Sequence, residues 1–376
     1  MSSVKILHCA DLHIGAAESS LGTLAASRQA ETLITFEKII NLANENSVDI
    51  MLIAGDLFNS NNVDKAFVDR VFECFNAIPN VKIVFAAGNH DPLNAESPFK
   101  KITLPENVFV LDTNDSYVQF DSLNTRVYGK SFKEVYMQGV ERFSLEADAN
   151  FINLMCIHGE LRSDLGSNYN SITSDFILNS GMDYIALGHV HKRTDVSKLG
   201  NTYVSYCGCP EGQGFDELGE KGVYIGDVSK QGCDLQFVPT AKRIHLTETV
   251  DVTGLTSSSE IAERILTTLA QKHSTNFADN LYKIVLSGHI EEGTIIGLAE
   301  ITSRLNDTLY FAKLRDKTEF AIDYETLSQE TTLKGIFVKN MLKRLENAEE
   351  FEKQQLMAAL NIGIKAFTGE VTYDED

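Results

Sequence analysis

Short apolar runs alternate with longer stretches of helical periodicity over the first 90 residues. The runs are VKILHCA from residue 4, DIMLIAG from residue 49 and VKIVFAAG from residue 81. Between them, residues 24–46 and 63–78 predict amphipathic helices, the second with Val63, Phe67 and Val71 on one stripe. Strands that alternate with helices predict a parallel sheet with helical crossovers.

The strand pattern continues into the middle of the chain and then changes. INLMCIHG (152–159), DYIALGHVH (183–191), NTYVSYCG and KGVYIGDV read as further strands, so a sandwich of two sheets flanked by helices is expected. Near residue 243 a new cycle of strand and helix begins, and from about 333 two amphipathic helices follow. The α/β chain is therefore expected to divide into residues 1–243, a smaller α/β part at 244–325 and a helical segment at 326–376.

Charge and composition restrict the classes of function. The chain carries 53 acidic and 33 basic residues, a formal net charge of −20, so its surface repels nucleic acid and a phosphate substrate needs a local positive site. The chain shows no secretory signal and no run near the roughly 18 apolar residues of a membrane span. Its six cysteines stand mostly alone in apolar stretches, as thiols do in a reducing compartment. We expect a soluble, cytoplasmic protein with no membrane partner.

Polar residues gather just after five of the predicted strands. One such cluster alone is more often a turn or a satisfied polar residue than a ligand. In open α/β sheets, however, the carboxyl ends of the strands share one crevice where ligands bind, so five clusters in register with strand ends indicate one site. The clusters are Asp11 with His13, Asp56, Asn89 to Asp91, His158, and His189 with His191.

Metal coordination explains why His, Asp and Asn side chains would converge there. Two divalent ions about 3.5 to 4 Å apart need about six nitrogen and oxygen ligands and a bridging group. Asp56 is the natural bridge because a carboxylate has two oxygens. Two dications bring four positive charges and Asp11 and Asp56 remove two, so the centre stays positive and attracts phosphate despite the acidic surface.

The motifs as a set resemble the calcineurin-like metallophosphoesterase superfamily over residues 4 to about 240. They are D-x-H at residue 11, GD at 55, GNHD at 88, HG at 158 and GHxH at 188. The resemblance implies an αββα two-sheet sandwich as the phosphoesterase domain, followed by a capping domain and C-terminal helices. The segments ILHCADLHIG, LIAGDLF and GFDELGEKGVYIGDV are similar to the SbcD-type DNA-repair exonuclease branch.

The resemblance also implies a role for each site residue. Asp56 would bridge two metal ions, for which manganese is the usual choice in that family. His90 would face the scissile phosphate as a catalytic group, and Asp91 would orient its ring. The first ion would be held by Asp11, His13 and His191, and the second by Asn89, His158 and His189.

The chain departs from the family pattern near the substrate. Some relatives carry a His directly after GDLF that helps to position nucleic acid, whereas this chain has Asn59. The usual Y-P-G-S turn reads Tyr-Cys-Gly-Cys at residues 206–209. Lys192 and Arg193 follow the last ligand and could contact a phosphate backbone, or equally be solvated loop charges.

The leading hypothesis is a two-metal phosphodiesterase acting on DNA, an exonuclease. The resemblance implies a partner, an SMC-type coiled-coil ATPase (SbcC-like), and a homodimer. A second hypothesis keeps the metal centre but changes the substrate to nucleotides, cyclic nucleotides or phosphoproteins. A third is a non-catalytic scaffold, which would be expected to lose ligands that this chain retains.

Overall fold

The computed structural model describes residues 2–139, 142–291, 294 and 296–368. Contacts divide the chain into two compact units. One comprises Met1–Thr249, Leu266–Val285 and Thr302–Arg315, and the other Val250–Ile265, Leu286–Ile301 and Asp316–Asp376. The predicted boundaries near residues 243 and 325 stay predictions, and the end of the predicted helical segment, 369–376, lies outside the described residues.

The first sheet contains the three strands that the opening pattern predicts. Its strand order is β14-β13-β1-β2-β3-β4, in which β1 to β4 run parallel and β13 is antiparallel to β1. Four helical segments belong to the crossovers of this part: η1 (Ser19–Leu24), α1 (Ala25–Glu45), α2 (Lys65–Ala77) and α3 (Pro98–Lys101). The strands are β1 (Ser3–Cys9), β2 (Ile50–Ile53), β3 (Lys82–Phe85), β4 (Val108–Val110), β13 (Gly222–Ser229) and β14 (Gly232–Pro239).

The second sheet has the order β11-β12-β10-β7-β6-β5, and β6, β7, β10 and β12 run parallel. Three strands at residues 108–130 (β4, β5 and β6) were not among the predicted ones. A small pair, β8 (Glu160–Arg162) and β9 (Ser171–Thr173), follows β7 and leads into α4 (Ser174–Asn179). The other elements are β5 (Ser116–Phe120), η2 (Asp121–Leu123), β6 (Thr125–Lys130), β7 (Ile152–His158), β10 (Tyr184–Gly188), β11 (Ser197–Leu199) and β12 (Thr202–Tyr206).

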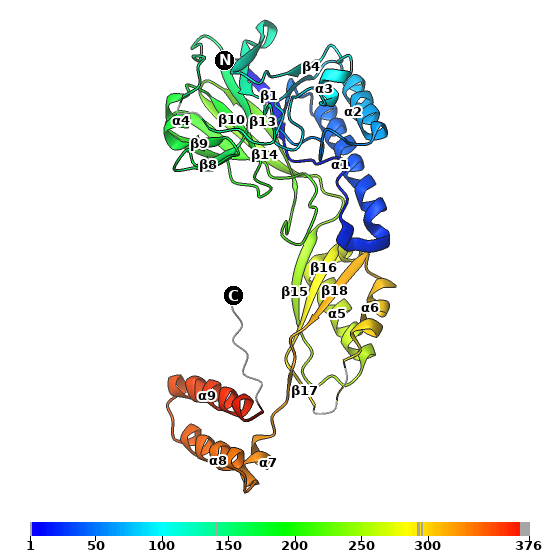
Figure 1. Ribbon diagram of the computed structural model, residues 1–376, viewed down its shortest axis with the longest axis vertical. Coiled ribbons are helices and arrows are strands. Elements are labelled where there is room, and N and C mark those ends of the chain that lie inside the picture. Colours follow the sequence, from blue (N-terminus) through cyan, green and yellow to red (C-terminus); the bar gives the residue numbers. More distant parts are fainter. Residues whose placement is uncertain (1, 140–141, 292–293, 295, 369–376) are drawn as a thin grey trace. The chain divides into compact units, whose positions relative to one another are not determined.

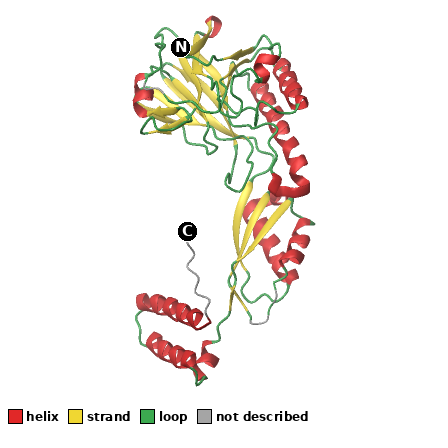
Figure 2. Ribbon diagram, viewed as in Figure 1, coloured by secondary structure: helices red, strands yellow, loops and turns green. Residues whose placement is uncertain are grey.

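Alternating side chains of the strands build a four-layer sandwich. Leu7 of β1 belongs to a buried apolar cluster with Phe36 of α1, whereas the preceding Ile6 belongs to another cluster with Leu154 of β7. The other face of the second sheet packs on α4. Figure 1 shows α1 and α2 on one side of the two sheets and α4 on the other, and Figure 2 separates strands from helices. The predicted αββα arrangement is confirmed, because successive strand residues point to opposite faces.

The rest of the chain forms a smaller α/β part and a helical end. A sheet of order β15-β16-β18 is accompanied by two helices, α5 and α6, and β17 pairs with β19. Helices α8 and α9 follow one another where two amphipathic helices were expected, and they share an apolar cluster built on Val338, Met341, Leu360 and Ile364. The bounds are β15 (His245–Asp251), α5 (Ser258–His273), η3 (Ser274–Asp279), β16 (Leu281–Ser287), β17 (His289–Ile290), α6 (Leu298–Asn306), β18 (Phe311–Asp316), β19 (Glu319–Phe320), α7 (Tyr324–Gln329), α8 (Leu333–Glu346) and α9 (Glu350–Thr368).

None of the helices in the described part of the chain is both long and apolar enough to traverse a lipid bilayer.

Candidate metal centre

Every predicted metal ligand lies at the carboxyl end of a parallel strand. Strands β1, β2 and β3 of the first sheet and β7 and β10 of the second end at the same edge of the sandwich. A hydrogen bond of 2.9 Å between Nδ1 of His158 and the carbonyl of Ala54 joins the two sheets there. The seven side chains come from just after β1 (Asp11, His13), β2 (Asp56), β3 (Asn89) and β10 (His189, His191) and from the last residue of β7 (His158).

The backbone at four of these residues adopts a conformation that non-glycine residues seldom take. The φ angles of Asp11, His13, Asp56 and His189 are 54°, 45°, 52° and 97°. Such positions cost on the order of 1 to 3 kcal/mol each and persist where neighbouring bonds enforce them. Here the backbone N–H of Asp11 donates to the backbone carbonyl of Gly55 at 3.0 Å, and the backbone N–H of His13 donates to the backbone carbonyl of Asp56 at 2.9 Å. The strain turns consecutive loop side chains toward one point.

One group of donors is formed by Asp11, His13 and His191. Each offers one atom, and these atoms lie within 4.8 Å of one another. Nε2 of His13 and Nε2 of His191 are 3.1 Å apart. The Asp11 carboxylate also accepts the backbone N–H of His189 at 2.9 and 3.1 Å, which fixes its orientation.

A second group of donors gathers around the side-chain oxygen of Asn89. This Oδ1 lies 3.0 Å from Nε2 of His158 and 3.2 Å from Nδ1 of His189. Asn89 and His158 are buried, and the His189 ring is stacked against Tyr169 with centroids 5.0 Å apart. The three donors predicted for a second ion are therefore adjacent.

Asp56 lies between the two groups. Its Oδ2 is 3.3 Å from Nε2 of His158 and 3.7 Å from Nε2 of His13, one ring from each group. Its Oδ1 accepts the backbone N–H of His90 at 2.8 Å. One carboxylate oxygen thus faces donors of both groups, as the predicted bridging role requires.

Burial and the charges of neighbouring residues act in opposite directions on the ionisable groups of the site. Burial opposes the charge on Asp56, but the charge of His158 and its hydrogen bond to that carboxylate outweigh burial and hold the pKa of Asp56 below its usual range. Burial also favours neutral His158, yet the adjacent Asp56 raises the pKa of its ring to about 9. Burial lowers the pKa of His13 and of His189 to about 4, so both rings are neutral at pH 7 and keep a free lone pair.

The donor set fits divalent cations. Four imidazoles, one amide and two carboxylates supply the mixed nitrogen and oxygen ligands that manganese, iron and zinc accept. Nδ1 of His158 faces a backbone carbonyl and that of His191 faces the carboxylate of Glu217, so Nε2 of both rings is left for a metal. The residues that would hold the ions are the seven predicted from the sequence.

His90 lies at the opening of the site and is exposed, unlike the buried donors next to it. Its ring stands edge-on to His13 with centroids 4.6 Å apart, and its Nδ1 lies 3.1 Å from the backbone carbonyl of Asn59. A neutral or charged ring that donates from Nδ1 leaves Nε2 directed elsewhere, which suits a group that meets the substrate.

The prediction that Asp91 contacts the His90 ring and orients it is wrong. The Asp91 carboxylate is fully buried and accepts backbone N–H groups of Asp56 (3.2 Å), Leu57 (2.8 Å), Phe58 (3.1 Å) and Gly88 (2.8 Å). Adjacent side chains point apart at this turn, so Asp91 faces inward while His90 faces out. Asp91 therefore holds the loop that carries Asp56, and the Asn59 carbonyl holds the ring.

The three residues predicted to meet the substrate are half-buried or exposed. Asn59 is half-buried and contributes its main chain to His90. Lys192 is exposed directly after the last ligand. The guanidinium of Arg193 lies over the ring of Phe237, 4.2 Å from the ring centroid. One face of the guanidinium is therefore covered by the ring.

Sequence reasoning missed several residues that shape the site. Glu217, 26 positions after His191, faces that ring from a loop of the GFDELGEKG segment. A Cβ at Gly88 would lie 2.2 Å from Oδ1 of Asp56, and one at Gly55 would lie 2.4 Å from Nδ1 of His158. The two glycines stood in the GD and GNHD motifs, and the requirement for close approach could have been proposed from them.

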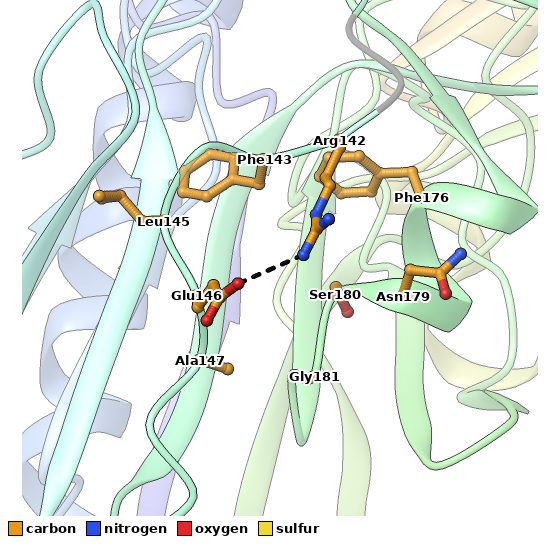
Figure 3. Close-up of a pocket in the computed structure, with 9 residues that line it drawn as sticks. All are labelled: Arg142, Phe143, Leu145, Glu146, Ala147, Phe176, Asn179, Ser180 and Gly181. Carbon is orange, nitrogen blue, oxygen red and sulfur yellow. Dashed lines mark hydrogen bonds and ion pairs between the residues drawn. The ribbon is translucent and has the colours of Figure 1, made fainter.

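A pocket with a volume of about 250 Å³ lies away from these donors (Figure 3). An ion pair of 3.4 Å between Arg142 and Glu146 crosses it. Its lining contains no predicted site residue, so the candidate chemistry does not reside there. The lining consists of Arg142, Phe143, Leu145, Glu146, Ala147, Phe176, Asn179, Ser180 and Gly181.

Comparison with known families gives a match to the part of the chain that forms this centre. The profile of the family described as Calcineurin-like phosphoesterase matches residues 4–193 of the 376. The matched range contains all seven donors and His90.

Individual relatives align over longer stretches. The chain is 28% identical over 291 residues to the Bacillus subtilis protein named Uncharacterized metallophosphoesterase YhaO, covering 73% of this chain and 70% of that one. It is 22% identical over 395 residues to the DNA double-strand break repair protein Mre11 of Saccharolobus solfataricus, covering 98% and 97%. The solved structure of TT1561 from Thermus thermophilus overlaps with a TM-score of 0.40 at 11% identity, over 64% of this chain and 100% of that chain.

Proposed function

The chain belongs to the calcineurin-like phosphoesterase family, and from this premise we propose that it is a two-metal phosphodiesterase acting on DNA as an exonuclease. Membership of the family supports a metal-dependent hydrolase. The observation that carries the proposal is the meeting of the two donor groups at Asp56, whose Oδ2 lies 3.3 Å from His158 and 3.7 Å from His13. This arrangement suits a pair of ions rather than one.

Seven side chains of this chain would hold the ions. Asp11, His13 and His191 form one set, Asn89, His158 and His189 the other, and Asp56 the bridge. When bound, divalent ions supply Lewis acidity toward a phosphoryl oxygen and lower the pKa of water. With two carboxylates against two dications the centre has a net charge of about +2, which attracts a phosphodiester to an otherwise acidic protein.

His90 would act on the substrate itself. Its exposed ring is fixed through Nδ1 by the Asn59 carbonyl, so Nε2 is the atom available to the leaving oxygen. A protonated ring stabilises charge that develops on the phosphoryl group and donates its Nε2 proton as the P–O bond breaks. Asp91 does not meet the substrate in this proposal. Its carboxylate accepts the backbone N–H groups of residues 56–58 and so fixes the loop that carries Asp56.

DNA is favoured as the substrate by the relatives that align along the chain. Mre11 proteins of Saccharolobus solfataricus and Methanopyrus kandleri are named for DNA double-strand break repair, and the latter is 23% identical over 357 residues, 87% of this chain and 76% of that one. Lys192 and Arg193 beside the last ligand, together with Asn59, are proposed to contact the phosphate backbone.

A partner would supply the DNA affinity that the chain's own charge of −20 opposes. We propose an SMC-type coiled-coil ATPase (SbcC-like) as that partner, and a homodimer as the working unit. The C-terminal helices expose Leu333 (74%), Ile336 (53%), Phe351 (79%) and Ile362 (60%), which is apolar surface of the kind that partner helices cover. Residues 1–243 would be the nuclease domain, 244–325 a capping domain and 326–376 the segment that binds the partner, in the cytoplasm.

The experiment compares substrates with manganese as the added ion. Full-length protein is offered labelled duplex DNA, single-stranded DNA and a small chromogenic phosphodiester, with and without Mn²⁺. Mononucleotide release from a DNA end supports the proposal. Turnover of the small ester alone would replace it with a phosphodiesterase for nucleotides or cyclic nucleotides. Stoichiometric Mn²⁺ binding without any turnover calls for co-purification of the ATPase partner, and a complex that is still inactive would favour the scaffold.

A further inference from the structure

A carboxylate stands behind one of the predicted metal ligands. The His191 ring has Nε2 toward His13 at 3.1 Å and hydrogen-bonds through Nδ1 to Oε1 of Glu217. One ring nitrogen therefore faces the candidate metal centre and the other faces Glu217. The Glu217 side chain is 11% exposed and the His191 side chain 31%, so the carboxylate is the more sheltered partner of the contact.

The Glu217 carboxylate is itself held in place. Its Oε2 accepts the backbone N–H of Gln213 at 2.7 Å and lies 3.4 Å from the Cys209 thiol. Its backbone N–H donates to Gly214 at 3.0 Å. An acceptor fixed from several sides defines a direction for the imidazole, which a mobile surface carboxylate would not.

The main chain at His191 is fixed as well. Its carbonyl accepts the Lys221 ammonium at 3.1 Å and the backbone N–H of Cys209 at 3.3 Å. Lys221 and Glu217 belong to the same segment, GFDELGEKG, which follows the last ligand by more than 20 residues. The GFDELGEKG segment therefore hydrogen-bonds to both the backbone and the ring of His191.

His158 shows what distinguishes this arrangement. Its Nδ1 faces the backbone carbonyl of Ala54, an acceptor that any residue can provide. The acceptor at His191 is the carboxylate of a side chain instead, Glu217. A carboxylate at Nδ1 keeps the proton on that nitrogen, leaves the Nε2 lone pair free and makes it a stronger ligand.

We propose that Glu217 is the positioning residue of the first metal site, which fixes the tautomer and orientation of His191 and thereby sets the affinity of that site for a divalent cation. The inference rests on the proposed function in that it takes His191 as a metal ligand. It assigns to the GFDELGEKG segment a role distinct from contact with the substrate.

The test measures Mn²⁺ binding to full-length protein by isothermal titration calorimetry. Glu217→Gln keeps the shape and removes the charge, Glu217→Ala removes the acceptor, and Asp216→Asn is the matched control at an exposed neighbour. We expect one of two binding steps to weaken about 10- to 100-fold in Glu217→Ala, less in Glu217→Gln and not in Asp216→Asn, with the other step unchanged. Equal affinity in all four proteins overturns the proposal.

A second measurement uses only the wild-type protein, so its result does not depend on whether a variant folds. Wild-type protein with ¹⁵N-labelled histidine is loaded with Zn²⁺ as a diamagnetic probe, and the ring nitrogens of His191 are observed by NMR. A protonated Nδ1 and an unprotonated Nε2 support the proposal, and the opposite tautomer overturns it. Protein that binds two ions and shows the Glu217 effect but cleaves no phosphodiester sinks the proposed function alone, whereas cleavage without a Glu217 effect sinks this inference alone.

Discussion

The backbone N–H of His90 donates a 2.8 Å hydrogen bond to Oδ1 of Asp56. The residue proposed to meet the leaving oxygen is thereby tied to the residue proposed to bridge the ions. Any displacement of Asp56 moves the loop of His90 with it, so the metal centre and the acid are positioned as one unit.

Replacement of Asp56 by Asn is expected to abolish stoichiometric binding of the second Mn²⁺ and to lower phosphodiesterase activity by more than about 100-fold. An amide removes the negative charge and turns one acceptor oxygen into a donor that faces the His158 ring. Calorimetric Mn²⁺ titration and turnover of a phosphodiester check this. Asp69→Asn, at an exposed pair with Lys65, is the control, and undiminished binding in Asp56→Asn would contradict the bridging role.

Replacement of His90 by Ala is expected to lower kcat by about 10²- to 10⁴-fold while Mn²⁺ affinity stays within about threefold. The ring is exposed and its Nδ1 lies 3.1 Å from the Asn59 carbonyl, although His90, His13 and Asp56 also offer ligand atoms within 4.8 Å of one another. Parallel rate and binding measurements separate the effects. Loss of metal together with activity would show that His90 is a ligand and not the acid.

Replacement of Gly88 by Ala is expected to reduce the free energy of unfolding by about 1 to 3 kcal/mol and to weaken metal binding. A Cβ there would lie 2.2 Å from Oδ1 and 2.7 Å from the backbone nitrogen of Asp56, so the carboxylate must shift. Urea unfolding and Mn²⁺ titration give the two quantities. Gly232→Ala is the control, because a Cβ at Gly232 meets nothing nearer than 4.0 Å.

Replacement of Glu31 by Gln is expected to lower the free energy of unfolding by about 2 to 3 kcal/mol at pH 7. Glu31 is buried and accepts from Arg28 at 3.0 Å, Arg243 at 2.9 Å and Lys242 at 3.0 Å. Burial opposes its charge, but these donors outweigh burial and hold the pKa of the carboxyl below the ordinary 4.5. Urea unfolding of both proteins over a series of pH values measures the difference.

The pH dependence of that difference has a defined sign. Because the folded-state pKa of Glu31 is lowered, its contribution is present above about pH 4.5 and is lost as pH falls through the folded-state value. The gap between the wild-type protein and Glu31→Gln should therefore close in acid. Glu73→Gln, whose ion pair with Arg70 is exposed, should change the free energy by less than about 1 kcal/mol at any pH.

Some elements left too weak a pattern to be predicted from the chain. Strand β4 has only three residues and lies at the edge of the first sheet, and β5 lies at the edge of the second with the burial pattern of a half-exposed strand. Strand β4 pairs with β3 and β6 pairs with β7, and single-sequence periodicity does not reveal either pairing.

The tertiary structure also decided the roles of some residues near the metal centre, which the sequence did not reveal. The family resemblance implied that Asp91 would orient His90, but the turn after β3 points the Asp91 side chain inward and the His90 side chain outward. Glu217 contacts His191 because the loop that carries it, 26 positions later in the chain, folds back on the site. No local sequence motif predicts that contact.

The sequence by itself predicted the sandwich and the polar clusters at the strand ends, and its resemblance to the calcineurin-like family selected seven candidate donors among them. Strand periodicity placed polar residues at strand ends, and parallel strands must end at one edge. Tertiary structure decided the distances that group those donors around Asp56, the inward turn of Asp91 and the carboxylate behind His191. These depend on loop backbones with positive φ and on contacts between residues far apart in the chain, which local sequence pattern does not encode.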